Sequence, residues 1–130
     1  MEWYTVSWTE RVYAELARRA TEHLQQGERV IIDANFRQEA QRRLFLELAV
    51  RWGVPALMLH CQASDDVVRE RLRHRQGDAS DADWDVYQEL APTWEPFSNA
   101  TQRQVVTLNA DAPPGDVVEQ AMRALHSQSA

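Results

Sequence analysis

The stretch RVIIDANFRQEAQRR, residues Arg29–Arg43, decides how the fold of this chain is interpreted. Its β-branched run, Val30–Ile32, is followed by an acid, Asp33, and then by residues of helical character. A short continuous apolar run is typical of a strand that is buried on both faces in a parallel sheet. An aspartate at the end of such a strand is suited to binding magnesium, water or a substrate hydroxyl.

Outward from this stretch, apolar runs alternate with amphipathic helices. We expect three strands, Arg29–Ala34, Ala56–Cys61 and Gln104–Leu108. Strands that alternate with helices through short connections predict a three-layer α/β fold with a parallel sheet. A length of 130 residues suits a single domain over residues 1–130, with residues 127–130 as a frayed tail.

Helix boundaries are marked by capping residues and glycines. Ser7 is expected to cap a first helix that Gly27 ends, and Asn35 to cap a second that Gly53 ends. Ser64, followed by two aspartates, is expected to open a third helix. Two further amphipathic helices follow nearer the C-terminus.

Composition excludes several functions. The net charge is −6, which argues against a general nucleic-acid binder. The single cysteine, Cys61, excludes an internal disulfide, and its place at the end of an apolar run predicts a buried thiol. No apolar stretch approaches the ~20 residues that span a bilayer, and the N-terminus has no secretory-signal pattern. We therefore expect a cytoplasmic protein that binds no membrane. The four histidines have no metal-ligand spacing, so we expect no metal site built from them.

The order of the motifs resembles a known family. The pattern VYAELARRA…VIIDANF…GVP, followed by CQAS…VVRERLRHR…DASDAD, resembles P-loop kinases of the zeta-toxin, gluconate kinase and polynucleotide kinase type. It is most similar to the AAA-like ATP-binding domain often fused to aminoglycoside-phosphotransferase-like domains. The likeness runs from about Tyr4 to Leu125.

The resemblance implies an acceptor side of a kinase site. It implies that Asp33 faces the phosphoryl acceptor as base or magnesium partner, and that Arg42 assists in catalysis. It also implies substrate or phosphate contacts for Asn35 and Arg43. The residues alone allow a plainer interpretation, in which Asp33 caps the backbone after it and the two arginines lie on a solvated helix face.

The resemblance also implies a lid over the phosphates. Arg71 and Arg75 match its arginine-rich helix and, four residues apart, share one helical face. Two guanidinium groups there could hold a phosphate chain. ATP and Mg²⁺ are the implied cofactors. Without the resemblance, the run Arg69–Arg75 is a surface charge cluster paired with nearby acids.

One part of the family pattern is missing. A P-loop is Gly-x-x-x-x-Gly-Lys-Ser/Thr, whose amides cradle phosphates and whose lysine bridges them. This chain has no lysine, and its four glycines fall singly in separate loops. We therefore expect a P-loop-kinase-like, N-terminally incomplete domain that lacks the first strand and the phosphate cradle.

Two functions follow from this pattern. The first is the acceptor-and-lid portion of an ATP-dependent kinase, inactive unless another polypeptide or a longer product supplies the P-loop. The second is a truncated, non-catalytic kinase-like module with an interaction or structural role. The coding region upstream of Met1 distinguishes them, since a continuous frame into a P-loop favours the first.

The missing strand also predicts an assembly. In the family it lies between the strand that ends at Asp33 and the strand Ala56–Cys61, so its loss leaves unpaired edges. The two strands could close on each other, the N-terminal segment Glu2–Trp8 could insert as a strand, or a second copy could complete the sheet. The aromatic N-terminus makes a homodimer our first choice.

Overall fold

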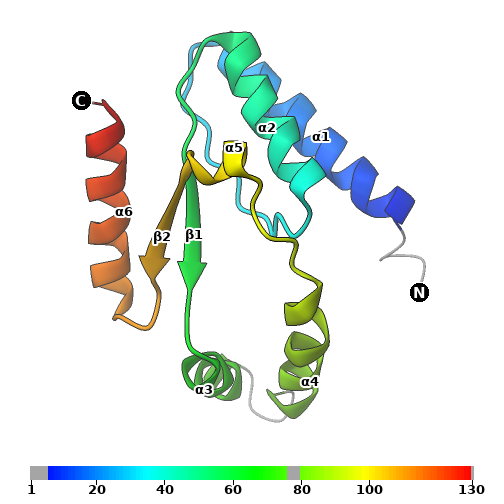
Figure 1. The fold of residues 1–130 in the computed structure, drawn as a ribbon, viewed down its shortest axis with the longest axis vertical. Coiled ribbons are helices and arrows are strands. Elements are labelled where there is room, and N and C mark those ends of the chain that lie inside the picture. Colours follow the sequence, from blue (N-terminus) through cyan, green and yellow to red (C-terminus); the bar gives the residue numbers. More distant parts are fainter. Residues whose placement is uncertain (1–5, 76–79, 130) are drawn as a thin grey trace. The chain divides into compact units, whose positions relative to one another are not determined.

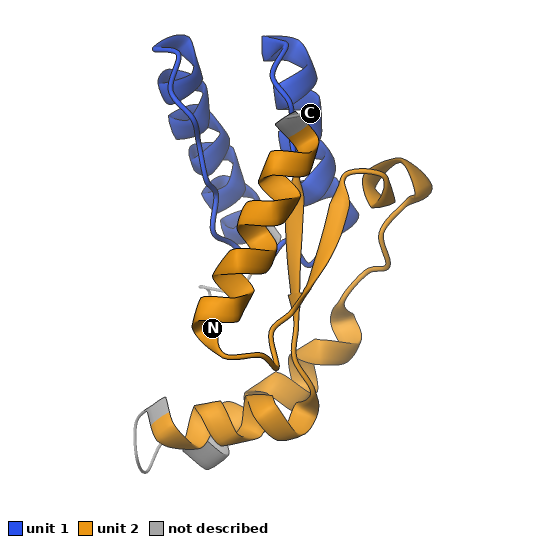
Figure 2. Ribbon diagram, turned by 90° about the vertical axis from the view of Figure 1, so that its left-hand side faces the viewer, with its two compact units in different colours: residues 1–56 blue, residues 57–130 orange. Residues whose placement is uncertain are grey.

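A computed structural model of the chain describes residues 6–75 and 80–129 (Figure 1). The chain divides into two compact units, residues 1–56 and residues 57–130 (Figure 2). The division falls in the segment that leads into the first strand.

The first unit is a pair of helices, α1 (Val6–Gln25) and α2 (Glu39–Trp52), that contact each other. Their buried apolar residues are Tyr13 and Ala20 of α1 and Leu48 and Ala49 of α2. Both helices end where glycine allows a left-handed backbone, as expected. Gly27 has φ +77° and Gly53 has φ +64°, and the Gly53 N–H donates to the Val50 carbonyl at 3.1 Å.

The expected strand Arg29–Ala34 is not formed, and this prediction was wrong. Exposure still alternates along the segment, with Val30 and Ile32 half-buried and Ile31 93% exposed. Within the described residues of the first unit there is no strand for the segment to pair with. The β-branched run favours an extended backbone, but a strand also requires a hydrogen-bonded neighbour.

The starts of both helices differ from expectation. Helix α1 already includes Val6, so Ser7 lies within it and does not cap it. The insertion of Glu2–Trp8 as a strand is therefore wrong for residues 6–8, while residues 2–5 lie outside the described part. Helix α2 is capped by Gln38 rather than Asn35, and the Gln38 N–H donates to Gln41 Oε1 at 3.1 Å.

The second unit contains a parallel sheet of two strands, β1 (Met58–Gln62) and β2 (Val105–Asn109). The register pairs Met58 with Val105 at one end and Gln62 with Asn109 at the other. The α/β class with a parallel sheet is confirmed. The sheet has two strands in the described part of the chain rather than three, because 29–34 does not join it.

Along the chain of this unit, helices lie between the two strands, and a last helix follows β2. Helix α6 (Pro114–Ser129) contacts β2, and Leu108 on that strand is only 3% exposed. Helices α3 (Asp65–Arg75) and α4 (Ser80–Leu90) contact each other, and a 3₁₀ turn, Ala91–Thr93, follows α4.

Some expectations at the ends of these elements were wrong. The short helix α5 (Asn99–Gln102) was not expected. Helix α6 includes residues 127–129, which were expected to be frayed, and residue 130 lies outside the described part. Cys61 is exposed, although its apolar neighbours suggested a buried thiol. A short strand in a small sheet leaves one edge or face open to solvent. None of the described helices combines the length and apolarity that a membrane span needs.

Candidate functional site

The loop between α1 and α2 presents Asp33 and Asn35 to solvent. Both side chains are exposed, and within the described part of the chain neither makes a hydrogen bond or an ion pair. Asp33 therefore does not cap the backbone that follows it, as the plainer interpretation proposed. Its carboxylate is available to a ligand.

The backbone behind these residues is held at Phe36. This residue has φ +49°, a left-handed conformation that costs an L-residue about 1–2 kcal/mol. Its N–H donates to the Tyr13 hydroxyl at 3.0 Å, and its carbonyl accepts from Arg42 Nε at 2.8 Å. Its ring makes edge contacts with Tyr13 and Phe45, at centroid distances of 5.6 and 5.4 Å. A strained backbone conformation persists only where several contacts hold it in place, as they do at Phe36. The shape of this loop is therefore fixed.

Arg42 is the residue that fixes the loop from the α2 side. It is 0% exposed, although it carries a permanent charge. Besides the Phe36 carbonyl, it donates from Nη2 to the Arg37 carbonyl at 3.1 Å and from Nη1 to Glu39 Oε1 at 3.2 Å. These partners compensate the buried charge. The structure therefore directs the guanidinium of Arg42 into its own loop.

Arg43 has a different environment from its neighbour. Its side chain is 52% exposed, and its Nε lies 3.7 Å from the carboxylate of Glu47 one turn further along α2. An exposed pair of this kind contributes little to stability and opens readily. Arg43 can therefore reach a ligand in a way that Arg42 cannot.

The arginine-rich helix α3 is tied to its surroundings at several points. Arg71 Nη2 donates to the Ala112 carbonyl, in the loop after β2, at a long 3.4 Å. The Arg69 guanidinium lies 5.4 Å from the Trp84 ring centroid, and Arg73 lies 3.8 Å from Glu70. Arg75 ends the helix, but its side chain lies outside the described part. The shared face of Arg71 and Arg75 remains a prediction.

Hydroxyl and carboxylate groups of the chain itself lie at the N-terminus of α3. The Ser64 hydroxyl accepts from the Val67 N–H at 3.3 Å, and the Ser64 N–H donates to Asp111 Oδ1 at 2.7 Å. Asp65 and Asp66 lie in the first turn. Negative groups near the positive end of a helix stabilise it and compete with an incoming anion.

A tyrosine links α3 to α4. The Tyr87 hydroxyl donates to Asp65 Oδ1 at 3.3 Å, and the Tyr87 ring stacks on Trp84 at 5.4 Å. Burial raises the pKa of Tyr87, and the Asp65 carboxylate raises it further. This bond joins the arginine-rich helix to its neighbour through two side chains.

The residues expected to form one site fall in two units. Asp33, Asn35, Arg42 and Arg43 lie in the first unit, and Arg71 and Arg75 lie in the second. Among the described residues, no group of three or more histidines, cysteines and acids is placed to hold a metal ion. Sequence reasoning missed the Tyr13 hydroxyl, which meets Phe36 23 residues away and has no local sequence signal.

A family model described as an AAA domain matches residues 1–96. That range includes the loop of Asp33, both helices of the first unit, β1 and the arginine-rich helix. No curated protein and no solved structure matches the chain.

Proposed function

This chain belongs to the AAA domain family, and from that premise we propose that it forms the acceptor-and-lid part of an ATP-dependent phosphotransferase. The family match indicates a P-loop NTPase-like domain, a class that generally binds nucleotide and Mg²⁺. The kinase-type role is our inference from the loop chemistry. The single observation that carries it is the exposed carboxylate of Asp33, which has no partner in the described part of the chain and lies on a loop held by the bond from the Phe36 N–H to Tyr13.

A phosphoryl acceptor needs a group that orients its hydroxyl. A positioned carboxylate can accept the proton of the attacking hydroxyl or coordinate the metal ion. Asp33 has the required freedom, because no described residue neutralises it. A loop held in one shape keeps such a group oriented before the substrate arrives, which lowers the entropic cost of reaching the reactive geometry.

The two arginines of α2 have separate roles in this proposal. Arg42 is a positioning residue that holds the carbonyls of Phe36 and Arg37, and through them the loop of Asp33. Arg43, exposed on the same turn, supplies the guanidinium that contacts the acceptor or its phosphate. Arg71 serves on the lid side, where its contact to the Ala112 carbonyl is long enough to exchange for an anion.

The residues of this chain do not fit the phosphate chain of ATP on their own. The sequence contains no P-loop and no lysine, and the N-terminus of α3 is occupied by carboxylates. Asp33 can supply one ligand to Mg²⁺, whose other ligands are usually waters and phosphates. The proposal therefore requires a P-loop from sequence outside these 130 residues or from another polypeptide.

A second function is supported by the same observations. A kinase-like module without a phosphate cradle could serve only to bind other proteins. The inward-facing guanidinium of Arg42 favours this alternative, because a residue expected to assist catalysis is committed to the fold.

The test begins with the coding region upstream of Met1. A continuous frame that encodes a P-loop supports the phosphotransferase, and the longer protein is then assayed for transfer from ATP and Mg²⁺ to candidate hydroxyl acceptors. Asp33→Asn should abolish transfer without lowering the unfolding temperature. The matched control is Glu119→Gln on the exposed surface of α6, which should retain activity.

A P-loop-containing protein whose transfer rate is unaffected by Asp33→Asn would refute the role of Asp33. A start codon at Met1 with no P-loop partner would favour the non-catalytic module.

A further inference from the structure

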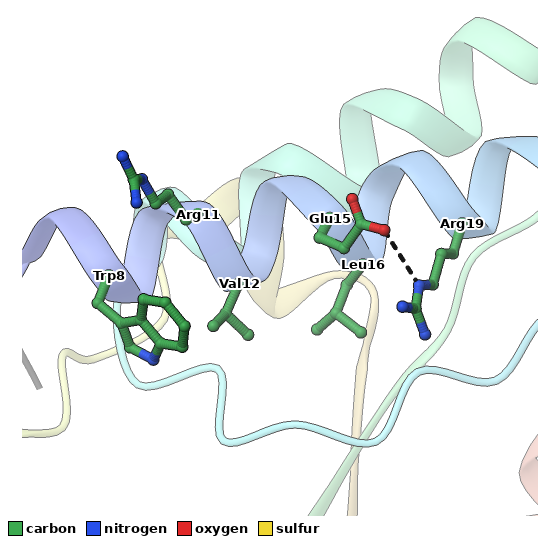
Figure 3. Close-up of a pocket in the computed structure, with 6 residues that line it drawn as sticks. All are labelled: Trp8, Arg11, Val12, Glu15, Leu16 and Arg19. Atoms are coloured by element: carbon green, nitrogen blue, oxygen red, sulfur yellow. Dashed lines mark hydrogen bonds and ion pairs between the residues drawn. The ribbon is translucent and has the colours of Figure 1, made fainter. Parts of the chain in front are cut away.

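Helix α1 has a second face besides the one that packs against its own unit. Six of its side chains line a groove of about 330 Å³ (Figure 3): Trp8, Arg11, Val12, Glu15, Leu16 and Arg19. Trp8 and Val12 are 42% and 39% exposed, more than is usual for residues that pack in a core. Apolar side chains grouped in a groove with charges beside them mark an interaction surface.

We propose that this groove is an interface between two copies of the chain, with the two α1 helices packed antiparallel about a two-fold axis at the level of residues 13–14. In such a dimer each residue faces the one that lies equally far beyond the axis. The midpoint of Arg11 and Glu15 is residue 13, and the midpoint of Val12 and Leu16 is residue 14. The midpoint of Trp8 and Arg19 falls between them. A single two-fold axis midway between residues 13 and 14 therefore lies within half a residue of the midpoint of each pair.

The angular positions on the helix agree with this axis. At about 100° per residue, Trp8 and Arg19 lie within about 20° of each other along the middle of the face. Val12 and Leu16 lie on one side of that line, and Arg11 and Glu15 lie on the other. In an antiparallel pair related by a two-fold axis, each side of this face lies opposite the same side in the second copy. Val12 and Leu16 therefore face Val12 and Leu16 of the second copy, and Arg11 and Glu15 face Arg11 and Glu15.

The pairs that result are chemically complementary. Val12 meets Leu16 of the second copy, which removes apolar surface from water. Arg11 meets Glu15 of the second copy, and this contact occurs twice by symmetry. Arg19 of the second copy approaches the face of Trp8, where a guanidinium is attracted to the ring. No pair places like charges opposite each other.

Glu15 is suited to this shared role. Within its own helix it accepts three hydrogen bonds, from Arg18 Nε at 2.9 Å, from Arg18 Nη2 at 2.5 Å and from Arg19 Nε at 3.2 Å. Hydrogen bonds from Arg18 and Arg19 lower the pKa of Glu15 to about 2, so the group is ionised at any working pH. A carboxylate has about four acceptor positions, so the three bonds within α1 leave one position for Arg11 of a second copy.

The interface is small. A single pair of helices buries less than the roughly 800 Å² per partner of a standard stable interface. We therefore expect a weak dimer that dissociates on dilution. The inference is independent of the phosphotransferase proposal, because it uses no residue of the Asp33 loop.

Charge reversal tests the pairing directly. The full chain is studied by sedimentation velocity between about 1 and 200 µM. Arg11→Glu places two acids opposite each other at both symmetry-related contacts, and Glu15→Arg places two bases there. Each variant alone should dimerise at least tenfold more weakly than the wild type. An equimolar mixture of the two should form a heterodimer, because the new acid at position 11 then faces the new base at position 15.

The control is Arg123→Glu, the same charge change on an exposed position of α6, which should dimerise as the wild type does. Circular dichroism of each variant checks that the helices remain, since both reversals also remove attraction within α1. The mixture experiment separates the two effects, because the attraction lost within α1 is the same whether a variant is studied alone or in the mixture. Only the contacts between copies differ. A wild type that is monomeric at 200 µM, a single reversal that dimerises normally, or a mixture that stays monomeric would each overturn the proposed interface.

Discussion

The hydroxyl of Tyr13 accepts a hydrogen bond from the backbone N–H of Phe36 at 3.0 Å, across 23 residues of sequence. Phe36 is the one described non-glycine residue with a positive φ, so the bond is made where the backbone is least favourable. The contact joins the middle of α1 to the loop that carries Asp33. It makes the geometry of the candidate site depend on a helix that contributes no ligand-binding group to it.

Replacing Tyr13 with phenylalanine should test that dependence. Tyr13→Phe keeps the ring contacts and leaves the Phe36 N–H without its partner, so we expect a loss of about 1–3 kcal/mol in the free energy of unfolding. Urea denaturation measures the loss, and hydrogen exchange of the Phe36 amide locates it. Tyr87→Phe, which removes a longer and more exposed bond, is the control and should cost less. Equal effects of the two substitutions would contradict the role given to Tyr13.

Truncation of two neighbouring arginines should change stability to very different extents. Arg42→Ala removes a buried charge together with its hydrogen bonds to the Glu39 carboxylate and to two carbonyls, so we expect a loss of about 3–5 kcal/mol. Arg43→Ala acts on an exposed pair and should change stability by less than about 0.5 kcal/mol.

Thermal unfolding of both variants makes the comparison. If Arg42→Ala does not fold, Arg42→Lys is measured instead, and it too should be destabilised because an ammonium cannot reproduce the forked donors. Two variants of equal stability would show that Arg42 does not hold the loop.

The bond between Tyr87 and Asp65 should make the contact between α3 and α4 sensitive to alkaline pH. The pKa of Tyr87 is raised above its unfolded value of about 10, so the folded state holds this proton more tightly. The stabilisation is full below pH 10 and is lost as pH rises through the folded pKa. The difference in unfolding temperature between wild type and Tyr87→Phe should therefore shrink from pH 9 to pH 11. A difference in unfolding temperature that grows from pH 9 to pH 11 would contradict a raised pKa of Tyr87 in the folded state.

The chain alone should neither hydrolyse ATP nor transfer its terminal phosphoryl group. Phosphoryl transfer depends on positioning and on electrostatic stabilisation by a phosphate cradle, and this sequence has no P-loop. Calorimetry with ATP and Mg²⁺ should show at most weak binding that falls as salt rises, as expected for exposed arginines. Submicromolar, Mg²⁺-dependent binding would refute this prediction.

Helices were predictable from this sequence because their determinants are local. The apolar face of α2 and the glycine after it, Gly53, specify the helix and its end within a few residues. The segment Arg29–Ala34 has the same kind of local strand signal, yet it forms no strand. β-Branched residues form a strand only when a neighbouring strand pairs with them, and the sequence of the segment does not specify that neighbour.

The candidate site was predictable in its chemistry but only partly in its geometry. The sequence placed Asp33 after an extended run, and its exposed carboxylate has no hydrogen-bond or ion-pair partner among the residues that the structure describes. Helical periodicity places Arg42 on the apolar face of α2, three residues before Phe45 and seven before Ala49, whereas Arg43 lies about 100° further round, so the inward direction of Arg42 was accessible from the sequence. The partners of Arg42 were not accessible, because they are two carbonyls of a loop with a left-handed turn at Phe36, whose N–H is bonded to Tyr13 in another helix.

The parallel pairing of β1 with β2 has a consequence for the order in which the chain acquires structure. Ser64 and Asp111, which follow the two strands and are bonded to each other, are 47 residues apart. Closing a segment of that length carries an entropic penalty before any strand bond forms, and contacts so distant in sequence slow folding. The α1–α2 pair has shorter connections and can form while the ribosome is still adding β2. We therefore expect the contact between α1 and α2 to form during synthesis before the sheet of the second unit exists.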